Sequence, residues 1–431
     1  MKKYMKCSVV VLFLVFILDI ILFKQAFDAF SCLVLLLSAA YFMYVFGIQQ
    51  LDSPVFRGLG FLLVPLSILT NLIFLLLVVL IVANYPPEKP FKSRFDLQQP
   101  SVKEIKAQQE LLSLLKEADS ACFTLPKDMD WQKNKFDFSY PGFDQLLEDG
   151  CQSERQTLID FIANRVTAIP YTEMGGELVI PMDYHIPNYA VLFKLFQIES
   201  TYIAGMLADG QNKMAGQRYL KLWQGVSQRL SSKEGLVNTM VTIRLISYLT
   251  ELYSEKEFDL APKTASTLVD LMADIPNLLD NSVADSFTRE YALSKGYILQ
   301  LSGAGASDSE TTLLGYFGDQ GGFLTNFEAR FSKWPFIDPV VQLKFVEDLQ
   351  WDFIEIQRLP FTEGKKRLEV LNQGIQDMAQ NPYSLVNPVG RILSAIATPV
   401  FDNYIETKEK TKSEVISLTN LLQEVHLDMG E

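Results

Sequence analysis

Cysteine and histidine are the side chains that most often bind metals or act as nucleophiles, and this chain has few of them. It contains four cysteines and two histidines in 431 residues. Cys122 and Cys151 can pair as a disulfide in an oxidising compartment, or they can remain free thiols. With His185 and His426 as the only histidines, and no Cys-x-x-Cys, the sequence offers no zinc site and no Ser-His-Asp or Cys-His centre. We therefore predict no metal and no cofactor.

Carboxylates are the second group that could do chemistry. Asp348, Asp352 and Glu355 have the i, i+4, i+7 spacing of one helix face, which a di-metal bundle would use. Such a bundle also needs Glu-x-x-His motifs, which the sequence lacks, so we expect a solvated acidic face. A pair for glycoside hydrolysis would have to come from the irregular stretches between 120 and 190, from Asp128, Asp130, Glu173, Glu177 and Asp183. Two carboxylates chosen from so many carry little information, and the sequence assigns no catalytic residue.

The stretch NPVGRILSAIATPVFDNYI at 387–405 is the most distinctive in the chain. Asn387 can cap a helix whose first position is Pro388, which is the favoured arrangement at a helix start. Gly390 would permit close packing in the first turn. Arg391 could contact a ligand, although a salt bridge near the helix start is the simpler interpretation. Asn387, Gly390 and Arg391 are the candidate binding residues.

Together with residues 189–253 and 334–369, this stretch resembles a group of uncharacterised proteobacterial proteins. Those proteins combine an N-terminal membrane segment with a helical region that contains an Asn-Pro-x-Gly-Arg helix. The resemblance covers about half of the chain. It implies a bacterial protein with the same helical organisation, and it implies no activity.

The elements that would position these residues begin with three apolar stretches, at 7–23, 29–48 and 59–83. A helix needs about 20 apolar residues to cross the hydrocarbon core of a bilayer. Lysines precede the first stretch, as in a signal peptide, but no cleavage site of small residues follows it. We predict a multi-pass anchor in the bacterial inner membrane at residues 1–84. The Lys/Arg counts on the two sides are equal, so the basic N-terminus and the two soluble-region cysteines favour a periplasmic helical region.

The charge of the chain is divided between its two parts. Residues 1–99 carry eight basic and five acidic residues, which leaves 30 basic and 46 acidic residues for 100–431, a balance of −16. Proteins bind phosphate backbones through Lys and Arg, so an acidic region disfavours nucleic acid as a partner. The predicted partners are the lipid bilayer, through residues 7–83, and another envelope protein.

Helical periodicity fills the soluble region. Val237, Val241, Leu245, Tyr248 and Leu252 form one apolar stripe, and polar residues such as 238 and 242 lie off it. Short breaks with turn residues join successive helices, which favours an all-α fold: transmembrane helices followed by a bundle of helical hairpins or an irregular TPR-like solenoid. Predicted helices cover 102–118, 154–166, 188–208, 212–230, 235–253, 262–274, 284–302, 338–358, 362–379, 388–405 and 411–427.

The predicted organisation is therefore an anchor at 1–84, a Pro-rich linker at 85–100, helices with long irregular loops at 101–187 and an α-helical hairpin region at 188–431. We expect a non-enzymatic scaffold that binds another envelope protein or a peptide. Two alternatives stay open. One is a membrane-bound hydrolase that uses carboxylates in the 120–190 loops, and the other is an accessory subunit of an envelope complex.

Overall fold

The computed structural model describes residues 93–301 with gaps of one or two residues, and residues 339–380 and 402–428. All of them belong to the second of the two units into which the chain divides, Pro86–Glu431. The three predicted spans and the candidate residues Asn387, Gly390 and Arg391 lie outside the described residues. The anchor and the Asn-Pro-x-Gly-Arg helix therefore stay predictions.

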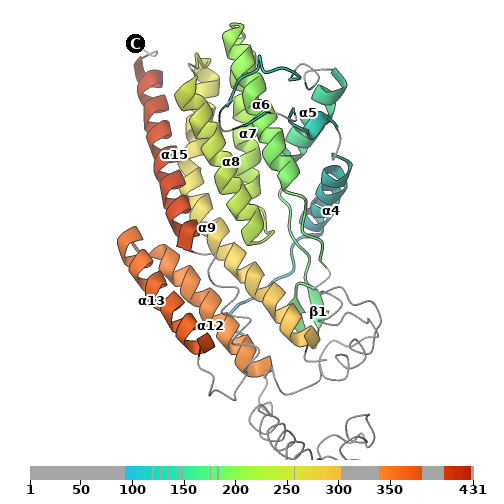
Figure 1. Ribbon diagram of the computed structural model, residues 1–431, viewed down its shortest axis with the longest axis vertical. Coiled ribbons are helices and arrows are strands. Elements are labelled where there is room, and N and C mark those ends of the chain that lie inside the picture. The colour runs from blue at the N-terminus through green and yellow to red at the C-terminus, as the bar shows by residue number, and fades with distance from the viewer. Residues whose placement is uncertain are drawn as a thin grey trace, which may run out of the picture. The chain divides into compact units, whose positions relative to one another are not determined.

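The described part of the chain is mostly α-helical, which confirms the all-α class at that level (Figure 1). Its two short strands, β1 (Thr172–Met174) and β2 (Glu177–Val179), pair as an antiparallel hairpin. A single 3-10 turn, η2, spans Ala121–Phe123. The helices are α4 (Val102–Glu117), α5 (Asp149–Asn164), α6 (Ala190–Ala208), α7 (Asn212–Leu230), α8 (Leu236–Glu255), α9 (Pro262–Leu301), α12 (Pro339–Arg358), α13 (Phe361–Gln380) and α15 (Asp402–Asp428).

Local sequence explains how α4 begins. The Ser101 hydroxyl accepts a hydrogen bond from the Glu104 backbone N–H at 3.2 Å, and the Glu104 carboxylate accepts one from the Ser101 N–H at 2.8 Å. This reciprocal capping box satisfies donors that an α-helix leaves free at its first turn. Ala107, Leu111 and Leu115 then form the buried face of the helix.

The central helix, α9, corrects one prediction. Separate helices at 262–274 and 284–302 were expected, because polar residues and Pro276 lie between them, but α9 runs unbroken through Pro276. A proline inside a helix removes one backbone hydrogen bond and costs about 3 kcal/mol. Burial of one continuous apolar stripe offsets that cost; its members, all 2 % exposed or less, are Leu268, Met272, Ile275, Leu279, Val283, Phe287 and Tyr291.

The last helix, α15, corrects a second prediction. A break was expected between residues 405 and 411, where the sequence is polar, but α15 passes through it. Lys408 is buried there with its Nζ 2.9 Å from Asp280 of α9, and the Thr411 hydroxyl lies 3.5 Å from that of Ser247 of α8. These polar residues have tertiary partners, so they do not mark a loop.

Helices distant in the sequence pack together around α9 (Figure 1). α9 contacts α7, α8, α12 and α15, and α15 also contacts α8. The Phe287 ring of α9 stacks on Phe353 of α12 at 5.2 Å, whereas the Lys408 contact with Asp280 fixes α15 to an earlier turn of α9. Phe287 also meets Tyr404 of α15 edge-on at 6.4 Å, so the same part of α9 contacts both α12 and α15.

The two irregular stretches noted in the sequence lie against the helices. In the aromatic stretch between α4 and α5, the Trp131 ring packs edge-on against Tyr248 of α8 at 6.1 Å, and Phe143 is fully buried. In the second stretch, which follows α5, Glu177–Val179 form β2. The Ile180 N–H then donates to the Ala292 carbonyl of α9 at 3.1 Å. Both stretches act as covers over helix faces.

The described end of the Pro-rich linker also lies on the helices. The Ser93 hydroxyl donates to the buried Glu347 carboxylate of α12 at 2.8 Å. The Phe95 ring stacks on Tyr291 of α9 at 4.7 Å and meets Trp351 of α12 edge-on at 5.7 Å. The chain is therefore fixed to α9 and α12 before α4 begins.

Candidate functional site

Cys122 and Cys151 meet at the N-terminal end of α5. Cys122 of η2 and Cys151 of α5 form a disulfide, with their Cα atoms 4.9 Å apart. The bridge fastens the aromatic stretch to the first turns of α5. Exposed His185 lies in the loop that follows β2.

The loop carboxylates considered for hydrolysis have separate surroundings. Asp130 lies 3.4 Å from Lys133, and Glu177 lies 2.5 Å from Nζ of Lys295 on α9. Glu173 is exposed on β1, where its strand partner is Leu178. Asp128 and Asp183 lie outside the described residues. Within the part of the chain that is described, no group of three or more His, Cys, Asp or Glu side chains could hold a metal ion.

The three carboxylates Asp348, Asp352 and Glu355 of α12 are partly exposed. Asp348 is half exposed and pairs with Arg94 of the linker, and Glu355 pairs with Arg358 at 2.9 Å. Burial raises the pKa of Asp352 above its usual value. The row contributes to surface ion pairs, one of which holds the linker.

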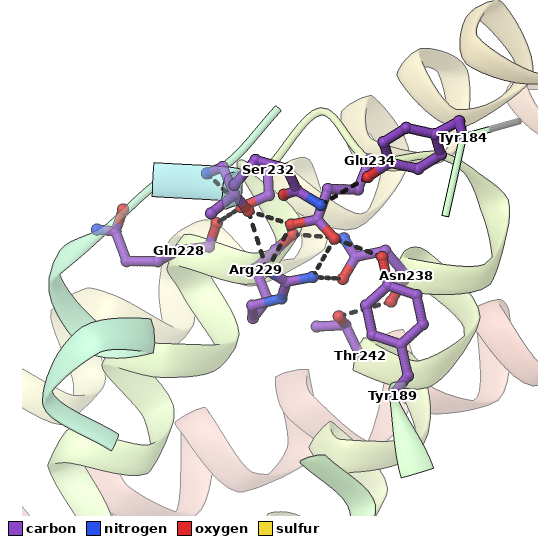
Figure 2. Close-up of polar contacts among 10 residues, drawn as sticks. Tyr184, Tyr189, Gln228, Arg229, Ser232, Glu234, Asn238 and Thr242 are labelled. Atoms are coloured by element: carbon purple, nitrogen blue, oxygen red, sulfur yellow. Dashed lines mark hydrogen bonds and ion pairs between the residues drawn. The ribbon is translucent and has the colours of Figure 1, made fainter. Parts of the chain in front are cut away.

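A polar network of five residues lies inside the bundle and is called here the balanced network (Figure 2). Arg229 at the end of α7 forms a two-pronged ion pair with Glu234, with Nη1–Oε1 and Nη2–Oε2 distances of 2.5 and 2.6 Å. Asn238 of α8 accepts from Arg229 Nη2, and its own amide donates to the Arg229 carbonyl at 3.0 Å. The hydroxyls of Tyr189 and Thr167 donate to the Glu234 carboxylate. All five residues are buried.

The members of the balanced network neutralise one another's charges and satisfy nearly all of one another's hydrogen-bonding groups. One positive and one negative charge cancel. Of the buried side-chain nitrogens and oxygens of the network, only Nε of Arg229 has no hydrogen-bond partner among the described residues. Burial and the Glu234 charge raise the pKa of Tyr189, so this phenol keeps its proton and remains a donor. The backbone of Lys233 also pairs with Thr167 and Ile169. The network therefore joins the turn between α7 and α8 to the segment that follows α5, which is a structural task.

A second buried ion cluster joins α5, α6 and α7, and we call it the arginine triad. Its single carboxylate, Glu199 of α6, accepts from Nε of Arg155 on α5 at 2.8 Å and from Nε of Arg218 on α7 at 2.5 Å. The side chains of Arg155 and Glu199 are 0 % exposed and that of Arg218 is 16 % exposed. The Arg218 guanidinium also lies over the Tyr202 ring, 4.7 Å from its centroid.

The arginine triad, unlike the balanced network, is matched neither in charge nor in hydrogen-bonding groups. Nη1 and Nη2 of Arg155 and Nη2 of Arg218 are buried and have no hydrogen-bond partner among the described residues. Two guanidinium groups share one carboxylate, so the cluster carries one surplus positive charge. Its arrangement can bind an acceptor with negative charge, which makes the triad the candidate site.

None of the residues of the two clusters is predicted as a site residue from the sequence. Glu199 carried a usable signal, because Leu195, Phe196 and Ile203 occupy the helix positions next to it at i−4, i−3 and i+4, and all three are fully buried. A carboxylate within such an apolar face must have a partner. No motif or spacing indicates that the partners come from α5 and α7.

One described helix, α6, has the length and apolar composition of a membrane span, but 67 % of its apolar window is buried within the structure, as in a core helix. Comparisons with protein-family models, with curated proteins and with solved structures found no match.

Proposed function

We propose that this protein is a membrane-anchored, non-enzymatic scaffold of the bacterial cell envelope whose helical region binds another protein or a peptide. The anchor is formed by the apolar stretches at 7–23, 29–48 and 59–83, in the inner membrane. The helical region lies on the periplasmic side and works as a bundle of helical hairpins or an irregular solenoid.

Exposed apolar side chains on two neighbouring helices are the observation that carries this proposal. α8 and α15 pack against each other, and each presents large apolar side chains to solvent. Val237, Met240, Ile416 and Leu421 are between 38 and 48 % exposed. Neighbouring helices with apolar side chains outside the core offer a surface to which an amphipathic helix or another protein can bind.

The disulfide supports the periplasmic side. Such bonds persist in oxidising compartments and are rare in the cytosol. Alkaline phosphatase fused after Glu431 tests this part of the proposal. An active fusion is expected, and an inactive one would place the helical region in the cytoplasm.

Photocrosslinking in native membranes tests the scaffold itself. A photoreactive amino acid at Met240 or at Ile416 should give a discrete crosslinked product, because both side chains lie on the proposed surface. The matched control is Gln109, an exposed residue of α4. The scaffold proposal fails if positions 240 and 416 give no product and the purified full chain cleaves a peptide or a glycan. That result would favour the hydrolase alternative.

A further inference from the structure

The arginine triad has a charge that its own residues do not neutralise. Two guanidinium groups face one carboxylate, and arginine stays protonated at any pH at which proteins are folded. Burying an unpaired charge is far more costly than burying a matched pair. A surplus positive charge at the junction of three helices therefore calls for a negative partner.

The unpartnered nitrogens show where that partner would bind. Nε of each arginine donates to Glu199, whereas both terminal nitrogens of Arg155 and one of Arg218 have no acceptor among the residues described by the structure. Buried donors in proteins nearly always have acceptors. These three belong to the two side chains that bind the two oxygens of Glu199, so we place the acceptor beside that carboxylate.

We propose that the arginine triad binds one small monovalent anion, of which chloride is the probe. A single negative charge brings the cluster to neutrality, and a phosphate or sulfate dianion would reverse its sign. Arg155 and Glu199 are wholly enclosed and Arg218 is mostly enclosed, so a compact ion fits this site better than an organic acid. The anion completes the hydrogen bonding of α5 and α7 and is independent of any protein partner.

Stability measured against chloride concentration tests the proposal on the purified full chain. Chloride replaces gluconate at constant ionic strength, so general screening does not change. A ligand that binds only the folded state raises the melting temperature, by about 5 °C at a hundredfold excess over its dissociation constant. The rise should saturate, and broadening of the chloride-35 NMR signal should report binding directly. Equal melting temperatures in chloride and gluconate, with no broadening, would overturn the proposal.

Three variants make the test specific. Arg155→Met removes two of the donors and should abolish both the stabilisation and the broadening. Glu199→Gln removes the competing negative charge and should tighten chloride binding by about tenfold. Loss of folding could not mimic that second result. Arg289→Met is the matched control, because Arg289 of α9 is also buried with two unpartnered nitrogens but lies over the Tyr171 ring outside the triad.

The control should keep the full response to chloride. The proposal is wrong if Arg155→Met binds chloride as well as the parent chain does, or if Glu199→Gln binds it more weakly. It is equally wrong if Arg289→Met alone removes the effect, since the anion would then bind at α9.

Discussion

The balanced network and the arginine triad are two buried ion clusters of the same helical body, and each uses an arginine of α7. Arg229 meets one carboxylate, and an amide and two hydroxyls complete the hydrogen bonding around that pair. Arg218 shares its carboxylate with Arg155, and three of their terminal nitrogens have no hydrogen-bond partner in the part of the chain that the structure describes.

The difference shows that burial alone does not identify a binding site. Both clusters are enclosed, but only the balanced network has equal positive and negative charge, and only one of its buried donors, Nε of Arg229, has no acceptor among the described residues. Completeness predicts a structural role and high sensitivity to the loss of one member. A surplus of charge and of donors predicts that the cluster accepts something from outside the chain.

Breaking the balanced network should have the largest effect. Arg229→Met leaves the Glu234 carboxylate buried without its counter-ion, and the loss of one member of a buried pair costs about 3–5 kcal/mol. Urea unfolding of the purified full chain, followed by circular dichroism, measures the change. A loss below about 1 kcal/mol would mean that Glu234 finds another partner or solvent, and the network would not be essential.

Removal of the disulfide should come next. The Cys122→Ser/Cys151→Ser double variant frees a segment with a sequence separation of 29 residues, and such bonds stabilise by about 2–4 kcal/mol. Because the bond fastens α5, hydrogen exchange should increase around Arg155 more than around Arg229. Equal increases at both clusters would argue against a local effect on the triad.

Arg155→Met should destabilise less than Arg229→Met, although both replace a buried arginine. Arg218 still neutralises Glu199 in the variant, and the two unpartnered nitrogens of Arg155 are gone. We expect a loss of about 1–2 kcal/mol in urea unfolding without chloride, typical of a single buried substitution. A loss as large as that of Arg229→Met would show that the triad is as interdependent as the balanced network.

The smallest expected effect is on the pH dependence of the free energy of unfolding at high pH, to which only the balanced network should contribute. The pKa of Tyr189 is raised in the folded state from an ordinary value of 10.0, mainly by burial. Its contribution is complete below pH 10 and is lost above it, because the unfolded phenol then releases a proton that the folded one keeps. Tyr189→Phe should reduce the fall in stability above pH 10 by up to ~1.4 kcal/mol per pH unit. Arg155→Met should leave that slope unchanged, since the triad contains no tyrosine.

Periodicity predicted most of the helices because their apolar stripes reflect burial directly. Val241, Leu245, Tyr248 and Leu252 are buried as the stripe required, whereas Val237 at its start is 46 % exposed. The breaks were harder to predict: Pro276 and the polar stretch around Lys408 resemble loop signals, but their neighbours are fixed by contacts far away in the sequence.

The partners within the two buried ion clusters could not be predicted from the sequence, for a related reason. Asn238 lies off the apolar stripe of α8, where a solvent-facing residue is expected, yet it is buried beside Arg229. Periodicity predicts on which side of the helix a polar residue lies, but it does not predict which groups of other helices that residue contacts. The arginines of the triad lie on helices whose packing only the tertiary structure shows.

The most direct measurement is an anomalous difference map from crystals of the full chain grown in bromide. Bromide replaces chloride and scatters anomalously, so its position identifies the site without any variant. We predict a peak within hydrogen-bonding distance of Arg155 and Arg218 and none beside Arg229 and Glu234. A water molecule, or a carboxylate of the chain other than Glu199, bound to the terminal nitrogens of both triad arginines, with no anomalous peak, would contradict the account.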